Sequence, residues 1–309
     1  LVKLLPEDAD LLHELSACRA RLGRYEEAID AAQRFAKLPG CEARGYTLIG
    51  LLERDRGNNQ KCAEAWSRVL SIKPEADDLQ VSAGEFFLEY GKALMLSGDA
   101  GRAEPALERG VSLAESAAAL AWLGKAQQQL GRREQSERSW LRAVQLEPVN
   151  FMALEGLAEL QMQQRDFAGA LARLQPVEKE SGLTSTTGFL LQRLYGLVDQ
   201  PEKSAEWKQR TETLRRLEDA RVRMEQVIVN SPDTMWAQVF QAWYLAEQNN
   251  REQAKVLLYP FVKEDAEEFI LMLWTSLRDG LPLPGLEHVP MEADRKSTRL
   301  NSSHLVISY

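Results

Sequence analysis

Apolar residues recur at intervals of three and four along most of the chain, a spacing that predicts amphipathic helices. Three segments show the pattern well, and each ends on an aliphatic residue followed by proline or by proline and glycine: EEAIDAAQRFAKLPG, AWSRVLSIKPEA and ERSWLRAVQLEPVN. A second amphipathic segment precedes each of them. The chain is therefore predicted to fold as successive pairs of helices.

Each first helix is predicted to carry a large apolar residue, another apolar residue three positions later, and a small residue next. These triplets are Leu12/Leu15/Ser16, Tyr46/Ile49/Gly50, Phe87/Tyr90/Gly91, Leu120/Leu123/Gly124 and Leu154/Leu157/Ala158. Each second helix has one small residue at the predicted crossing with the first: Ala28, Cys62, Ala103, Ser136 or Ala170. Since the distance between two packed helices depends on the side chains at the contact, small residues on both helices predict a close crossing.

Four of the predicted pairs have a glycine between their helices: Gly23, Gly57, Gly98 and Gly131. Their spacings are 34, 41 and 33 residues, and the fifth turn keeps the phase with Arg165 at this place. Glycine tolerates the left-handed backbone that ends one helix and leads into the next. Pro74 and Pro148 are predicted to end second helices, because proline has no amide hydrogen to continue them.

These positions closely resemble the tetratricopeptide repeat, a helix–turn–helix unit of about 34 residues. GRYEEAIDAAQRFAKLPG and LAWLGKAQQQLGRREQSERSWLRAVQLEP carry the resemblance best, and it covers residues 1 to about 180. The resemblance implies an all-α, right-handed α-solenoid of stacked helix–turn–helix repeats. The one long spacing comes from seven additional residues in PEADDLQVSAGEFFLEY. Seven residues are about two helical turns, so the face pattern is kept and the helix there can lengthen.

The repeat pattern also divides the chain into segments. We expect residues 1–6 to be the end of a truncated repeat, 7–182 an array of about five repeats, 183–280 divergent repeats with a packing helix, and 281–293 a linker. With suitable codons, DRKSTRLNSSH back-translates into a widely used short-read sequencing adapter. We therefore interpret residues 294–309 as a disordered, adapter-derived artefact without function.

The net charge of the chain is −8. Residues 294–309 contribute three basic residues against Asp294, or +2, so residues 1–293 carry −10. This charge disfavours nucleic acid and anionic membranes as partners, because both bind through clusters of lysine and arginine. No stretch of eighteen apolar residues occurs, so a membrane is expected as a partner only indirectly if at all. The first residue is leucine, and a missing N-terminus leaves the compartment unknown, with the cytoplasm favoured.

The sequence offers little catalytic chemistry. Three scattered cysteines are too few for a disulfide framework or a metal cage. Apart from residues 294–309, only His13 and His288 could act as imidazole groups, and no metalloprotease, nucleophile-elbow or phosphate-loop motif is present. We therefore predict no catalytic, cofactor or metal site, no cofactor, no small-molecule substrate and no enzyme activity.

In tetratricopeptide-repeat proteins the first helices line the concave surface, which is the usual ligand groove. The residues of these helices that avoid the core triplets give the candidate groove: Leu48, Leu51, Lys92, Leu96, Trp122, Lys125, Gln129 and Met152. Lys92 and Lys125 have equivalent places in adjacent units, and we expect both to lack close counter-charges and to attract an acidic group. The alternative is that Trp122 packs against a neighbouring repeat and that the lysines are merely solvated.

The resulting hypothesis is a non-catalytic scaffold that binds a protein, as a peptide or a helix, in the concave groove. Two alternatives stay open at this point. One is a regulatory or substrate-presenting arm of a larger enzyme of the glycosyltransferase or sulfotransferase type. The other is a subunit of a membrane or secretion assembly.

Overall fold

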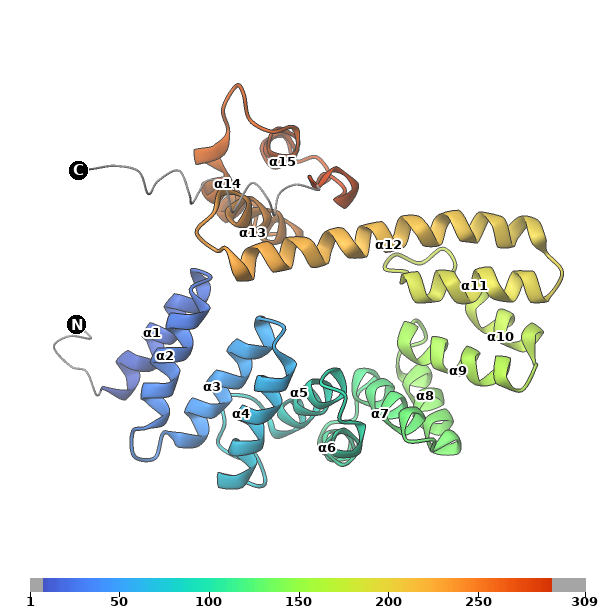
Figure 1. Cartoon of the computed structure of the whole chain (residues 1–309), viewed down its shortest axis with the longest axis horizontal. Helices are drawn as coiled ribbons and strands as arrows, with labels where there is room; N and C mark the ends of the chain where they lie inside the picture. Colours follow the sequence, from blue (N-terminus) through green and yellow to red (C-terminus); the bar gives the residue numbers. More distant parts are fainter. Residues whose placement is uncertain (1–7, 291–309) are drawn as a thin grey trace, which may run out of the picture. The chain divides into compact units, whose positions relative to one another are not determined.

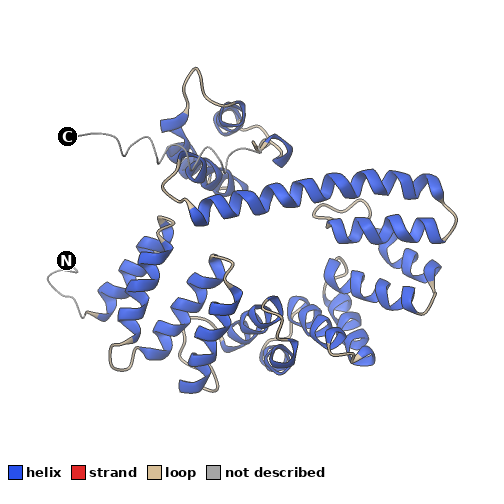
Figure 2. Ribbon diagram, viewed as in Figure 1, coloured by secondary structure: helices blue, strands red, loops and turns tan. Residues whose placement is uncertain are grey.

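The computed structural model describes residues 8–290, and within that range it contains only helices and the loops between them (Figure 2). The all-α fold class is thereby confirmed. The predictions for residues 1–6 and 294–309 lie outside the described residues. The described chain forms two compact units, residues 8–20 with 25–212 and residues 21–24 with 213–290.

The first unit begins with five helix pairs that follow one another along the chain (Figure 1). Their bounds are α1 (Ala9–Arg21) and α2 (Tyr25–Ala36), α3 (Glu42–Asp55) and α4 (Asn59–Ile72), α5 (Ala83–Leu96) and α6 (Ala100–Leu113), α7 (Ala117–Gln129) and α8 (Arg133–Leu146), and α9 (Phe151–Gln163) and α10 (Phe167–Leu174). The short helix η1 (Gln175–Val177) leads from α10 to α11 (Ser185–Leu197).

The predicted phase of the repeats is confirmed at the helix crossings. The small residues of the second helices at these crossings are all fully buried, with exposed fractions of 0%: Ala28, Cys62, Ala103, Ser136 and Ala170. The four turn glycines have φ angles of 72°, 73°, 87° and 73°, and Arg165 has the same left-handed backbone with a φ of 63°. The fifth turn therefore has the geometry of the other four without their glycine.

Polar side chains fix where many of the helices begin. The side chains of eight residues of the first unit accept a hydrogen bond from the backbone N–H three positions later: Asp8, Asn58, Ser82, Asp99, Ser116, Asn150, Asp166 and Thr184. Such a cap satisfies one of the first N–H groups of a helix, which have no partner within it, and contributes about 1 kcal/mol. The residue at which each of these helices begins is thus determined by a side chain next to it in the sequence.

The seven additional residues do not lengthen a helix, although their number would allow it. α5 has 14 residues, the same as α3. The extra residues form a loop before α5 in which Ala76 and Asp78 have positive φ angles of 53° and 50°. Ser82 caps α5 through the N–H of Glu85 and so sets its start, which leaves the inserted residues outside the helix.

The first helices form one side of the array. α5 contacts α7, α7 contacts α9, and α9 contacts α11. No contact of the same extent joins successive second helices in the part of the chain that the structure describes. Elements that lie on the inside of a curved stack are closer together than those on the outside. From α5 to α11 the first helices therefore form the inner face and the second helices the outer face, and α1 to α4 continue the same repeat phase.

α12 (Pro201–Asn230) is a helix of 30 residues that follows α11, and its residues belong partly to the first unit and partly to the second. The second unit continues with α13 (Met235–Glu247), α14 (Arg251–Leu258), η2 (Tyr259–Phe261), α15 (Glu268–Asp279) and η3 (Leu286–His288). Asn249, with a φ of 63°, makes the turn between α13 and α14, and Ala254 beyond it is fully buried.

The core of the second unit is aromatic and aliphatic. It contains the fully buried side chains of Trp236, Phe240 and Leu273. Pro284 and Val289, in the segment expected to be a linker, belong to this packing: the carbonyl oxygen of Pro284 accepts a hydrogen bond of 3.1 Å from the indole N–H of Trp243, and Val289 is 6% exposed. Residues 281–290 therefore cover part of this core.

Candidate functional site

The predicted groove residues all lie on first helices, which form the inner face of the first unit. Leu51, Lys92, Trp122, Lys125 and Met152 are half-buried, and Leu96 and Gln129 are exposed. Leu48 is a correction. It is only 8% exposed and packs in the core cluster that contains Ala28 and Ile29, so it cannot contact a partner in the groove.

Lys92 is paired within its own helix, contrary to the expectation that it lacks a close counter-charge. Its Nζ lies 2.6 Å from Oε1 of Glu89, three residues earlier on α5. The other carboxylate oxygen of Glu89 is 3.5 Å from Arg54 on α3. Because Glu89 neutralises part of both cations, Lys92 attracts an incoming anion less than an isolated ammonium group would.

Lys125 has a different environment. Its Nζ lies 5.2 Å from the centroid of the Trp122 ring, within the range of a cation–π interaction. No carboxylate lies within ion-pair distance of it among the described residues. Trp122 is half-buried and packs on its inner side against the cluster that contains Tyr90 and Leu94. The tryptophan thus supports the neighbouring repeat and also presents part of its ring next to a cation.

Glu155 on α9 is held by hydroxyl groups from the next repeat. The side chains of Thr184 and Thr187 both donate hydrogen bonds to its Oε1. Burial raises the pKa of Glu155, while these two hydrogen bonds and the positive charge of Lys125 act in the opposite direction. The carboxylate therefore links α9 to the start of α11 through two hydrogen bonds.

A pocket of about 300 Å³ opens between α9 and α11. Met162 and Leu190 line it, together with Phe189, whose side chain is 47% exposed. Glu159 and Arg193 give it one charge of each sign. An exposed aromatic ring in a lined pocket is a typical anchor point for an apolar side chain of a partner.

The sequence interpretation missed Phe189 and Arg193, although a signal was present. Asp199 has a positive φ of 58° at the turn after α11, and it lies 34 residues after Arg165. The repeat phase therefore continues through α11. It was overlooked because this turn has no glycine and the small residue of the first helix is replaced by Gln192.

Other kinds of site find no support in the residues that the structure describes. No group of three or more histidine, cysteine, aspartate or glutamate side chains among them could hold a metal ion. Burial raises the pKa of Cys62 to about 12, so this thiol is not a nucleophile at neutral pH. None of the described helices has the length and apolar character needed to cross a membrane.

Residues 123–175, from α7 to the end of α10, match the family model described as tetratricopeptide repeat. The chain therefore contains tetratricopeptide repeats. The match falls on the repeats whose crossings and turns are described above, and these repeats form a scaffold of the protein-interaction type.

One curated relative of this chain is Superkiller protein 3 of Schizosaccharomyces pombe, with 26% identity over 112 residues. The matched stretch is 36% of this chain but spans only 8% of the length of that relative. Among solved structures, a tetratricopeptide repeat protein from Parabacteroides merdae is 14% identical, with coverage of 87% of this chain and 98% of the other and a TM-score of 0.54. Pseudomonas aeruginosa pilF is 15% identical, with coverage of 76% and 97% and a TM-score of 0.51. At these identities the likeness shows a shared fold.

Proposed function

We propose that this tetratricopeptide-repeat protein is a non-catalytic scaffold that binds a peptide segment of a partner protein along the inner face of its first unit. The observation that carries the proposal is the half-buried ring of Trp122 beside the ammonium group of Lys125, which makes no ion pair among the described residues. Tryptophan is disproportionately common among residues that dominate binding energy. An adjacent free cation adds recognition of a carboxylate.

The second anchor point is the pocket around Phe189. Trp122 lies on α7 and Phe189 on α11, so the two residues are two repeats apart, with α9 between their helices. Neighbouring packed helices are about 10 Å apart, which places the two aromatic side chains roughly 20 Å apart. An extended peptide spans about 3.3 Å per residue, so about six residues bridge the two places. The proposed ligand is an extended segment with an apolar residue at each end of this span and an acidic residue near Lys125.

The test begins with selection of peptides from a displayed random library against the whole chain. The selected peptide is then titrated by fluorescence anisotropy against the wild type and against Trp122→Ala and Phe189→Ala. Each substitution is expected to weaken binding by about tenfold or more, because truncation of an aromatic residue that dominates binding costs about 2 kcal/mol or more.

Leu113→Ala is the matched control, because Leu113 has an exposed fraction of 46%, close to that of Phe189, and lies at the end of the second helix α6. It should leave the affinity unchanged, and circular dichroism should show the same helicity for all variants. If the selected peptides bind the two aromatic variants as tightly as the wild type, the inner face is not the binding site.

A further inference from the structure

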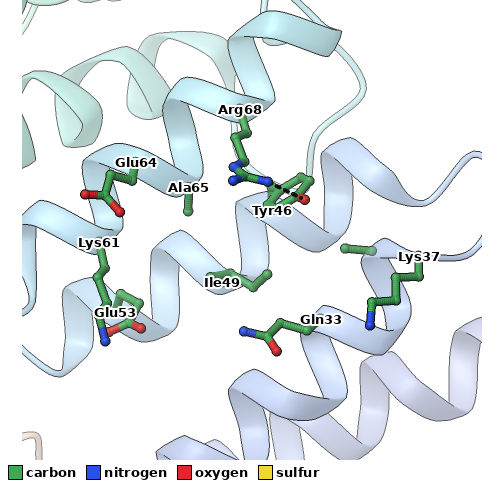
Figure 3. A pocket seen from close by; sticks show the side chains of 10 residues that line it. Gln33, Lys37, Tyr46, Ile49, Glu53, Lys61, Glu64, Ala65 and Arg68 are labelled. Carbon is green, nitrogen blue, oxygen red and sulfur yellow. Dashed lines mark hydrogen bonds between the residues drawn. The ribbon is translucent and has the colours of Figure 1, made fainter.

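A groove of about 360 Å³ lies on the outer face between the second helices α2 and α4, with α3 as its floor (Figure 3). Its lining residues come from all three helices and from the residue that follows α2: Gln33, Ala36, Lys37, Tyr46, Ile49, Glu53, Lys61, Glu64, Ala65 and Arg68. Three of them lie on the first helix α3, but none is among the predicted groove residues of the inner face or in the pocket around Phe189. The groove therefore raises a separate question of what it binds.

The shape of the groove follows from small residues. α3 packs closely on α2, since a β-carbon on Gly45 would lie 2.4 Å from the β-carbon of Ala36. The second helices α2 and α4 are separated on the outer face, and Ala36 and Ala65 leave their facing sides open. Ile49 of α3 forms an apolar floor between them. The result is a channel with apolar side chains at its base and polar side chains along its rim.

Three cations surround this channel. Lys37, Lys61 and Arg68 are all exposed, and none of them has a carboxylate within ion-pair distance among the described residues. Arg68 is held in place by Tyr46: its Nη1 donates a hydrogen bond of 3.1 Å to the tyrosine hydroxyl, and its guanidinium carbon lies 5.3 Å from the ring centroid. The guanidinium group is therefore oriented before any ligand arrives.

The two carboxylates of the groove do not cancel these charges. Glu53 is 4% exposed, and its Oε2 faces Arg56 at 3.6 Å, so its charge is compensated inside the protein. Glu64 is exposed and accepts a hydrogen bond of 3.2 Å from Gln60. Three accessible cations thus face one accessible carboxylate, in a chain whose net charge is −8. This local excess of positive charge complements an anionic ligand.

We infer that the groove between α2 and α4 is a second binding site, which takes an acidic peptide segment with apolar residues between its carboxylates. Lys61 and Arg68 are seven residues apart on α4, or about 10.5 Å along the helix axis. At about 3.3 Å per residue, two acidic residues three positions apart in an extended segment match that distance. The apolar side chains between them cover Ile49.

The probe is a fluorescein-labelled octapeptide with two aspartates three positions apart around two leucines, titrated against the whole chain by fluorescence anisotropy. The matched probe has asparagine in place of both aspartates. Lys37→Gln combined with Lys61→Gln removes two rim charges that make no hydrogen bond or ion pair among the described residues, so the fold should be kept. We expect this variant, and the asparagine probe, to lower the affinity by about tenfold, since each removes two charges and exposed ion pairs contribute modestly one by one.

Two further variants serve as controls. Arg138→Gln removes an equally exposed cation from α8, and Trp122→Ala alters the inner face, so neither should change binding of the aspartate probe. Three results would overturn the inference: no saturable binding by the wild type, an equal loss in Arg138→Gln, or full affinity in the double glutamine variant. Displacement of the probe by inorganic phosphate at constant ionic strength, at concentrations similar to the peptide, would mean that the groove takes small anions and not a peptide.

Discussion

A β-carbon placed on Gly124 would lie 2.4 Å from the indole nitrogen of Trp140, whose N–H donates a hydrogen bond of 3.1 Å to the carbonyl oxygen of Ala121. Trp66 stands in the same relationship to Gly50, at 2.0 Å. The large residue of the second helix thus occupies the volume that glycine leaves free on the first. These two repeats are closed by volume complementarity and by one buried hydrogen bond each.

The first prediction follows from this contact. Gly124→Ala should lower the free energy of unfolding by about 1–3 kcal/mol, because overpacking forces Trp140 to move. Gly101→Ala is the control, since the nearest atom to its new β-carbon is 3.8 Å away and alanine favours a helix over glycine. Urea denaturation followed by circular dichroism measures both. Equal effects would show that the Trp140 contact is not what limits the size of residue 124.

The second prediction concerns the turn at Arg165. A non-glycine residue with left-handed backbone costs about 1 kcal/mol, so Arg165→Gly should raise the free energy of unfolding. The greater conformational freedom of glycine in the unfolded chain reduces this gain in part. Gly131→Arg is the reciprocal change and should destabilise. No atom lies within 4 Å of a β-carbon on Gly131, so the second effect reports the backbone alone. Denaturation midpoints that move in the same direction for both variants would contradict this account.

The third prediction concerns pH. Since burial raises the folded-state pKa of Glu155 above its ordinary value, the folded protein holds this proton more tightly than the unfolded chain does. The stabilisation from this group is therefore present below about pH 4.5 and is lost as the pH rises through the raised pKa. Glu155→Gln removes the ionisation, so its melting temperature should rise relative to the wild type as the pH increases from about 4 to 8.

Thr187→Val provides the internal control for this titration. The threonine hydroxyl donates to the carboxylate and lowers its pKa, so its removal should move the pH window upward. Thermal melts of the three proteins across the pH series distinguish the cases. A difference between Glu155→Gln and the wild type that does not vary with pH would mean that ionisation of Glu155 is not involved.

The fourth prediction separates the two lysines of the inner face. If an acidic ligand residue meets Lys125, then Lys125→Gln should weaken binding of the selected peptide by about threefold to tenfold, while Lys92→Gln should change it by less than about twofold. The reason is that Glu89 already forms an ion pair with Lys92, whereas Lys125 lies beside the Trp122 ring and interacts with Glu155 only beyond ion-pair distance. Isothermal titration at two salt concentrations should show a reduced salt dependence only for the Lys125 variant.

Sequence reasoning was reliable where a property depends on residues close in the chain. The burial of Ala28 and Cys62 and the turn at Arg165 follow from spacing alone, because each repeat packs on itself and its neighbours in the same way. The pairing of Lys92 with Glu89 was also readable in principle, since residues three apart are neighbours on a helix. It was missed because only equivalent positions in different repeats were compared.

Other features depend on contacts that spacing does not reveal. Leu48 and Leu51 both avoid the core triplet, yet only Leu48 is buried, because its side chain meets the cluster around Ala28 and Ile29. The loop before α5 could not be distinguished from a longer helix by length, since seven residues preserve the helical phase. The pocket around Phe189 requires α9 and α11 to be side by side, which follows only when the repeat is known to continue through α11.

From α5 to α11 the first helices touch while the second helices are separated, and this contrast has a mechanical consequence. When stacked repeats are joined through their first helices, they bend about these contacts. Small changes in curvature therefore alter the spacing of the second helices more than that of the first helices. In the first two repeats, α2 and α4 each pack on α3 and make no contact of the same extent with each other. A ligand bound in the groove between them would add a link between these two second helices, and would thereby stiffen the first two repeats.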